Sequence, residues 1–160
     1  LNENDIGDFK TFLKLSPPLR SEDDRIALVN GVKSGLIDVI VSDHTPEDEE
    51  SKRLPFAQAA TGSIGVETLL SLALEMYHNE SLPLKKIIET LTINPAKILK
   101  INKGSLKVGN DADICIFDLN KPWVVKADDL KSKSKNTAIE DRKLQGKVIM
   151  TFLNGNLVYK

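Results

Sequence analysis

The sequence predicts an α/β protein in two segments, with β/α units over residues 1–100 and a small antiparallel β element over residues 101–160. In the first segment, amphipathic helical stripes alternate with a run at residues 37–41 in which four of the five residues are β-branched and apolar. In the second, Asn154-Gly155 separates two β-rich runs. Asn-Gly is the preferred two-residue hairpin turn because both positions must accept positive φ.

The composition is that of a folded globular domain, with 160 residues, 41% of them hydrophobic and 28% charged, and a net charge of −1. Residues 1–80 carry seven basic and fifteen acidic residues, whereas residues 81–160 carry fifteen and eight, which predicts a dipolar surface. The lysine-rich stretch 131–135 has no interleaved aromatic residues, and no apolar run approaches the ~20 residues of a bilayer span. We therefore expect no nucleic-acid or membrane partner. The lone Cys115 excludes an internal disulfide, which fits the cytoplasm.

The first segment begins with an apolar run at residues 9–15, predicted to be a strand that Pro17-Pro18 ends. Ser21 then predicts the N-cap of a helix whose first turn is acidic and which stops at Gly35. The buried stripe of this helix is predicted at Ile26, Val29 and Val32.

The run at residues 37–41 is typical of a parallel strand buried on both faces. Two amphipathic helices follow, and a short helix over residues 95–99 is predicted with Asn94 as its cap. Their apolar stripes are Val66, Leu69, Leu70, Leu74 and Tyr77 for one, and Leu84, Ile87, Ile88 and Leu91, after Pro83, for the other.

The second segment predicts strands at residues 114–117 and 123–125 and a hairpin of residues 147–153 and 156–159. The charged stretch 127–147 predicts an exposed loop or lid. Two parallel strands cannot form a stable sheet. Since the chain also begins at Leu1 and not at Met, we expect it to be a portion of a longer protein.

Candidate chemistry lies where the predicted buried strand ends, because functional groups of α/β proteins gather past the carboxyl ends of strands. Asp43 at that point is either a metal ligand or general base, or a cap for the turn before Pro46. His44 is interpreted as a turn or supporting residue. With no His-x-His pair and no second histidine nearby, the chain cannot assemble a metal site unaided.

Five ordered motifs carry a resemblance to a known family: Lys-Leu-Ser-Pro-Pro-Leu-Arg at residues 14–20, Ser-Asp-His-Thr-Pro at 42–46, Gly-Ser-Ile-Gly-Val-Glu at 62–67, Asn-Pro-Ala-Lys at 94–97, and the Gly-rich return at 104–113. The chain resembles the last two-fifths of dihydroorotases, which belong to the cyclic amidohydrolase superfamily.

The resemblance implies a metal-dependent hydrolase built on a (β/α)8 (TIM) barrel. Residues 1–100 would be its last β/α units, and residues 101–160 the C-terminal strands of its small β-sandwich domain. The implied reaction is the reversible cyclisation of N-carbamoyl-L-aspartate to dihydroorotate in pyrimidine biosynthesis. One or two Zn2+ would be held mostly by ligands outside this chain, so this portion alone would be inactive. The family also implies a homodimer.

The resemblance implies that Asp43 is the catalytic proton shuttle and a metal ligand, and that Ser16, Glu47, Thr61 and Gly62 bind the substrate. Three of these positions depart from the family, which usually has Asn, His and Phe in place of Ser16, Glu47 and Thr61.

These departures leave two alternatives open. One is a non-catalytic dihydroorotase-like subunit that scaffolds aspartate carbamoyltransferase. The other is a different cyclic amidase, such as an allantoinase or hydantoinase, although the Pro17-Pro18-Leu19-Arg20 element favours dihydroorotase.

Overall fold

A computed structural model describes all 160 residues, which divide into two compact units. The first unit comprises residues 1–31, 42–69 and 124–142, and the second comprises residues 32–41, 70–123 and 143–160. Both units therefore draw on both of the segments predicted from the sequence. The predicted boundary near residue 100 concerns the domains of a longer protein and stays a prediction.

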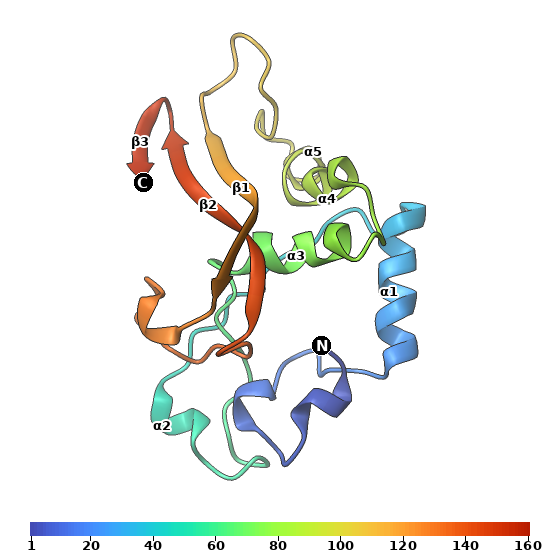
Figure 1. Cartoon of the computed structure of the whole chain (residues 1–160), viewed down its shortest axis with the longest axis vertical. Helices are drawn as coiled ribbons and strands as arrows, with labels where there is room; N and C mark the ends of the chain where they lie inside the picture. The colour runs from blue at the N-terminus through green and yellow to red at the C-terminus, as the bar shows by residue number, and fades with distance from the viewer. The chain divides into compact units, whose positions relative to one another are not determined.

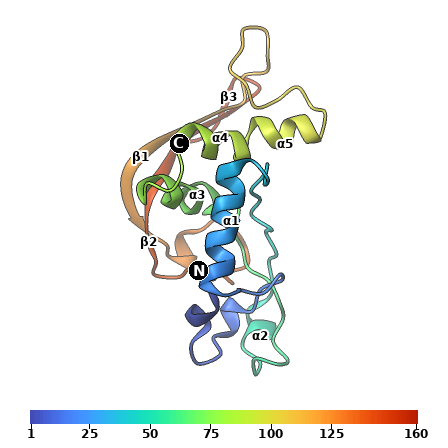
Figure 2. The same ribbon diagram turned by 90° about the vertical axis from the view of Figure 1, so that its right-hand side faces the viewer.

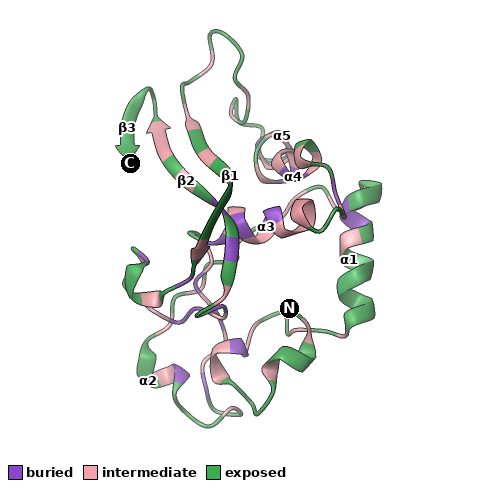
Figure 3. Ribbon diagram, in the orientation of Figure 1, coloured by how far each residue is buried: buried purple, intermediate pink, exposed green.

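The first helix confirms its predicted start and end. α1 spans Glu22–Ser34, the Ser21 hydroxyl accepts the Asp24 N–H at 3.2 Å, and Gly35 follows with φ +83°. Its predicted stripe is only partly right, because Val32 is buried whereas Ile26 is 44% exposed. Figure 3 shows most of α1 coloured as exposed. Leu28 of the same helix is also exposed, at 58%.

The first unit has little regular structure besides α1. It holds the 3-10 turns η1 (Glu3–Ile6), η2 (Thr11–Leu13) and η3 (Ala127–Asp129), and the single-turn α2 (Glu49–Lys52). The strand predicted at residues 9–15 is wrong, since η2 occupies its centre. Hydrogen bonds from side chains to the backbone connect the loops of this unit, as described below.

The second unit packs three helices with a three-stranded sheet (Figure 1). α3 (Leu69–His78), α4 (Leu84–Leu91) and α5 (Ile93–Ile98) follow the predicted order. Val32, Ala73, Leu82 and Ile87 form a buried cluster. Asn94 is not a cap as predicted, because it lies inside α5 and its side chain donates to the Asp38 carbonyl at 2.9 Å.

The strand predicted at residues 37–41 is not formed as a regular strand. Ile37 and Ile40 pack against the buried cluster and the Ile40 N–H donates to the Thr90 carbonyl at 3.2 Å, but Val41 is 71% exposed. A parallel strand forms its backbone hydrogen bonds with a neighbouring strand, and no strand of this chain pairs with residues 37–41.

The sheet has the order β1-β2-β3, formed by Ile114–Val124, Lys143–Leu153 and Asn156–Tyr159. β2 and β3 pair antiparallel through the predicted turn, with φ +49° at Asn154 and +78° at Gly155, which confirms the hairpin. The two strands predicted at residues 114–117 and 123–125 are one continuous strand. β1 lies at the sheet edge, where Pro122 is tolerated.

α3 lies beside β1 and β2 in both views of the ribbon (Figure 2). The Ser71 hydroxyl donates to the Gly146 carbonyl and accepts the Trp123 indole N–H at 3.2 Å. Leu74, which is fully buried, sits so close to Gly146 that a Cβ there would overlap its Cδ1. β2 therefore comes close to α3 at Gly146, where the absence of a side chain leaves room for Leu74.

We expect Gly146→Ala to lower the free energy of unfolding by about 1–3 kcal/mol more than Gly109→Ala does, because Leu74 cannot move aside without overpacking. Gly109 is a matched control, since both glycines have φ +92° and a Cβ at Gly109 meets nothing within 4 Å. Urea denaturation of both variants measures the difference. Equal losses would show that backbone strain alone is responsible.

Candidate active site

The loop that carries Asp43 crosses a second loop, around Ser63, within the first unit. His44 and Ser63 form a parallel β-bridge, and the Thr45 N–H donates to the Ser63 carbonyl at 2.9 Å. Asp43 has φ +43°, and its carbonyl accepts the Thr45 hydroxyl at 3.0 Å. The turn leaves the Asp43 carboxylate exposed at the end of a short parallel pairing.

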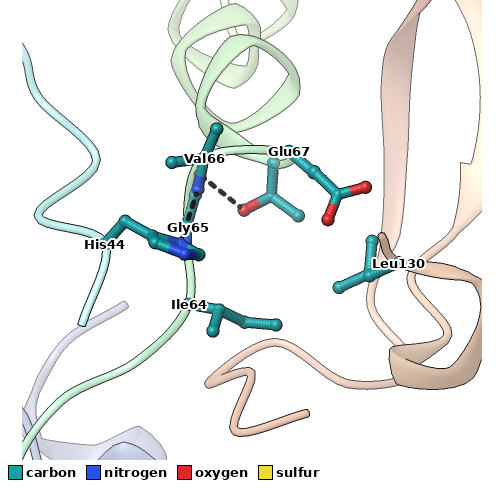
Figure 4. Close-up of a pocket in the computed structure, with 7 residues that line it drawn as sticks. His44, Ile64, Gly65, Val66, Glu67 and Leu130 are labelled. Atoms are coloured by element: carbon teal, nitrogen blue, oxygen red, sulfur yellow. Dashed lines mark hydrogen bonds between the residues drawn. The ribbon is translucent and has the colours of Figure 1, made fainter. Parts of the chain in front are cut away.

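The His44 side chain binds the backbone of the segment that precedes α3. Its Nδ1 accepts the Gly65 N–H at 3.2 Å and the Val66 N–H at 3.5 Å, and Figure 4 shows the ring beside both. In a neutral imidazole, a nitrogen that accepts leaves the proton on the other one. This arrangement corresponds to the tautomer of the neutral ring with the proton on Nε2, in which Nδ1 is not free to bind a metal.

Gly62 lies where two loops touch. Its φ is +137°, and a Cβ there would come within 2.7 Å of Thr45 Cγ2, so no other residue fits. Its N–H donates to the Lys14 carbonyl at 3.0 Å, two residues before Ser16. Ser16 is exposed, and Thr61 is half-buried.

Lys52 lies under these loops with a fully buried side chain. Its ammonium donates to the carbonyls of Ala60 and Gly62, both at 3.0 Å, and of Lys14 at 3.3 Å. Burial lowers the pKa of Lys52, and the Glu47 carboxylate opposes this by favouring the charged form. The sequence placed Lys52 at the end of an acidic run and gave no sign of this burial.

The stretch 127–147, predicted to be an exposed loop or lid, is an irregular segment up to residue 142 that is only partly exposed. Asn136, Thr137 and Ile139 are buried, and residues from 143 onward belong to β2. The Asn136 side chain donates to the carbonyls of Thr45 at 3.1 Å and Gly62 at 3.3 Å, and accepts the Glu47 N–H at 3.2 Å. This stretch therefore connects the Asp43 loop to the Gly62 loop.

Glu67 ties the same stretch to the chain before α3. Its two carboxylate oxygens accept the N–H groups of Lys131 at 2.9 Å and Ser132 at 3.0 Å. Beside Glu67 lies a shallow surface depression that is open to solvent and encloses no room for a small-molecule ligand (Figure 4). Its lining is His44, Ile64, Gly65, Val66, Glu67, Thr68 and Leu130.

The structure brings together the loops of Asp43, Glu47 and Thr61–Gly62 around Lys52 and Asn136. Ser16 joins them only through Lys14, two residues before it. Sequence reasoning missed both connecting side chains. No sequence signal marked either Lys52, which follows an acidic run, or Asn136.

A Zn2+ site was implied by the family resemblance. No group of three His, Cys, Asp or Glu side chains in the chain lies close enough to hold a metal ion. Asp43 fits as a single oxygen ligand because its carboxylate is exposed, whereas His44 uses Nδ1 within the fold. The residues of this chain do not make a metal site by themselves.

The chain belongs to the amidohydrolase family, whose sequence pattern matches residues 12–158. It is 44% identical over 160 residues to a dihydroorotase of Ehrlichia chaffeensis, an alignment that covers 100% of this chain and 36% of that protein. It is 46% identical over 147 residues to a dihydroorotase of Aquifex aeolicus, which covers 92% of this chain and 35% of the relative. The chain therefore spans about a third of the length of these relatives.

Solved structures give the same fold. The L-hydantoinase (dihydropyrimidinase) from Arthrobacter aurescens superimposes with a TM-score of 0.90 at 32% identity, and a D-hydantoinase with 0.89 at 24% identity. Each match covers 100% of this chain and 37% of the other. The structural likenesses confirm the predicted α/β fold class, and the sequence relatives confirm the resemblance to a portion of a dihydroorotase. None of the five α-helices has the length and apolar character to cross a membrane.

The nitrogen NMR signals of the His44 ring are expected to show the proton on Nε2 and a bare Nδ1, because Nδ1 accepts backbone N–H groups. Spectra of 15N-histidine protein at a pH where the ring is neutral measure this, and His44→Phe assigns the signals. A proton found on Nδ1 would contradict the arrangement.

Proposed function

We propose that the protein to which this chain belongs is a dihydroorotase, which interconverts dihydroorotate and N-carbamoyl-L-aspartate in pyrimidine biosynthesis. The observation that carries the proposal is the 44% identity to the Ehrlichia chaffeensis dihydroorotase along the full length of this chain. The exposed Asp43 carboxylate, held where two loops meet, supports it because a general base must be rigid and accessible.

In this proposal, Asp43 acts as the proton shuttle. During ring opening its carboxylate takes the proton of the attacking water and passes it to the leaving ring nitrogen, and ring closure reverses these steps. When bound, Zn2+ polarises the scissile carbonyl and activates the water. Asp43 is the one ligand that this chain contributes, and most ligands lie outside it.

Ser16, Glu47, Thr61 and Gly62 are proposed to bind the substrate. Glu47 is the least expected of them, because an anion opposes a substrate that carries carboxylates. At about 4 Å and an effective dielectric near 20, such a repulsion is on the order of 4 kcal/mol. The buried Lys52 cation, which interacts electrostatically with Glu47, supports the proposal by offsetting part of this repulsion.

A hydantoinase is the second candidate, favoured by the 32% identity to the L-hydantoinase of Arthrobacter aurescens. Substrates distinguish the two, since a hydantoin ring lacks the carboxylate of dihydroorotate. A non-catalytic subunit that scaffolds aspartate carbamoyltransferase would turn over neither. As further parts of the proposal, the protein acts in the cytoplasm as a homodimer.

We expect Asp43→Asn in the complete protein to lower the rate of dihydroorotate ring opening by at least ~100-fold, the usual contribution of a general base. Glu50→Gln, an exposed residue of α2 with the same change in charge, should leave the rate unchanged. Steady-state kinetics on dihydroorotate and on hydantoin measure both variants beside the wild type.

Wild-type turnover of dihydroorotate no faster than buffer would remove the proposed function. An unchanged rate in Asp43→Asn would instead remove Asp43 from its role. Metal analysis of the same samples tests the zinc, which should be present in the wild type and reduced in the variant.

A further inference from the structure

Two buried side chains donate to one backbone oxygen in the first unit. The Lys52 ammonium reaches the Gly62 carbonyl at 3.0 Å, and the Asn136 amide reaches the same oxygen at 3.3 Å. The Gly62 N–H is also used, by the Lys14 carbonyl at 3.0 Å. The N–H and the carbonyl of Gly62 are therefore both hydrogen-bonded to residues at least ten positions away in the sequence.

Lys52 has no capacity left for a ligand. Its ammonium carries three N–H donors, and carbonyl oxygens of Lys14, Ala60 and Gly62 take all three. No carboxylate is among its hydrogen-bond partners, although burying a cation is costly without one. This arrangement indicates that Lys52 serves to hold these three carbonyl groups in place.

Asn136 is saturated in the same way. Its Nδ2 donates to the Thr45 and Gly62 carbonyls, and its Oδ1 accepts the Glu47 N–H and, at 2.7 Å, the Ser134 hydroxyl. These four bonds are the full capacity of an amide. Only 2% of Asn136 is exposed, so it does not face a substrate.

We propose that Lys52 and Asn136 are positioning residues of the active site, an inference that rests on the proposed function. Lys52 holds the two backbones next to Ser16 and at Gly62, which carry substrate-binding positions. Asn136 holds Gly62 as well, and adds the loop that runs from Asp43 to Glu47. The two side chains therefore have different predicted effects on binding and on turnover.

Lys52→Met keeps the length of the side chain and removes all three donors. The substrate-binding loops should loosen, and KM for dihydroorotate should rise by about tenfold or more while kcat changes less. Asn136→Ala also frees the Asp43 loop. Both kcat and KM should worsen there, and kcat/KM should fall by between about 10-fold and 100-fold.

Thr90→Val is the matched control. The Thr90 hydroxyl is fully buried and donates to the Ile87 carbonyl at 2.7 Å within the second unit, whereas all of the site loops belong to the first unit. Each variant is assayed as the complete protein at the same interval below its own melting midpoint. If Thr90→Val loses as much activity as the two site variants, Lys52 and Asn136 act through stability only and the proposal is overturned.

Ser134→Ala covers the case in which Asn136→Ala does not fold. It removes the single hydroxyl proton that Asn136 Oδ1 and the Glu47 carbonyl share, and leaves both Asn136 amide donations in place. A loss in kcat/KM of about two- to fivefold, without an equal loss in Thr90→Val, supports the proposal. No loss would contradict it.

Hydrogen exchange separates this proposal from the proposed function. The amide protons of Thr45 and Gly62 should exchange faster than in the wild type in Lys52→Met and in Asn136→Ala, or in Ser134→Ala if Asn136→Ala does not fold. They should not exchange faster in Thr90→Val. An unchanged exchange rate in these variants overturns the positioning role. If the wild type does not turn over dihydroorotate, only the proposed function is contradicted. The hydrogen-exchange comparison still tests whether Lys52 and Asn136 hold the loops in place.

Discussion

The site depends on a carbonyl, that of Gly62, being held by two buried side chains. In a complete parallel sheet, the backbone ladder fixes the strand ends relative to each other. Here the residues before Asp43 form no ladder, and one bridge between His44 and Ser63 is the only strand-like pairing between the two site loops. Bonds from side chains to backbone therefore determine where the Asp43 and Gly62 loops lie.

A lysine suits this place better than an apolar side chain would. Three carbonyl oxygens converge on its ammonium, and leaving a buried acceptor unpaired costs about 1–3 kcal/mol. Together these bonds offset the cost of burying the cation, which is visible in the lowered pKa of Lys52. The same cation places positive charge beside Glu47, so one side chain shapes both the geometry and the electrostatics of the site.

Sequence patterns predicted the elements whose causes are local. The Ser21 cap, the Pro83 start of α4 and the Asn154-Gly155 hairpin depend on residues a few positions apart, and all three are present. The predicted strand at residues 37–41 failed because a strand needs partners elsewhere. Asn136 was missed because its partners Thr45 and Gly62 are 91 and 74 residues away.

The motifs that carried the family resemblance coincide with the closest approaches of the two loops. A Cβ at Gly62 would come within 2.7 Å of Thr45, and one at Gly65 within 2.8 Å of the Ser42 carbonyl. Ser42 and Thr45 flank Asp43 and His44, so the two glycines bring the second loop against both ends of the Asp43-His44 turn. Their spacing thus sets the position of the Asp43 carboxylate, and a side chain at either glycine would push that turn outward. The glycines are therefore part of the site although they have no chemistry of their own.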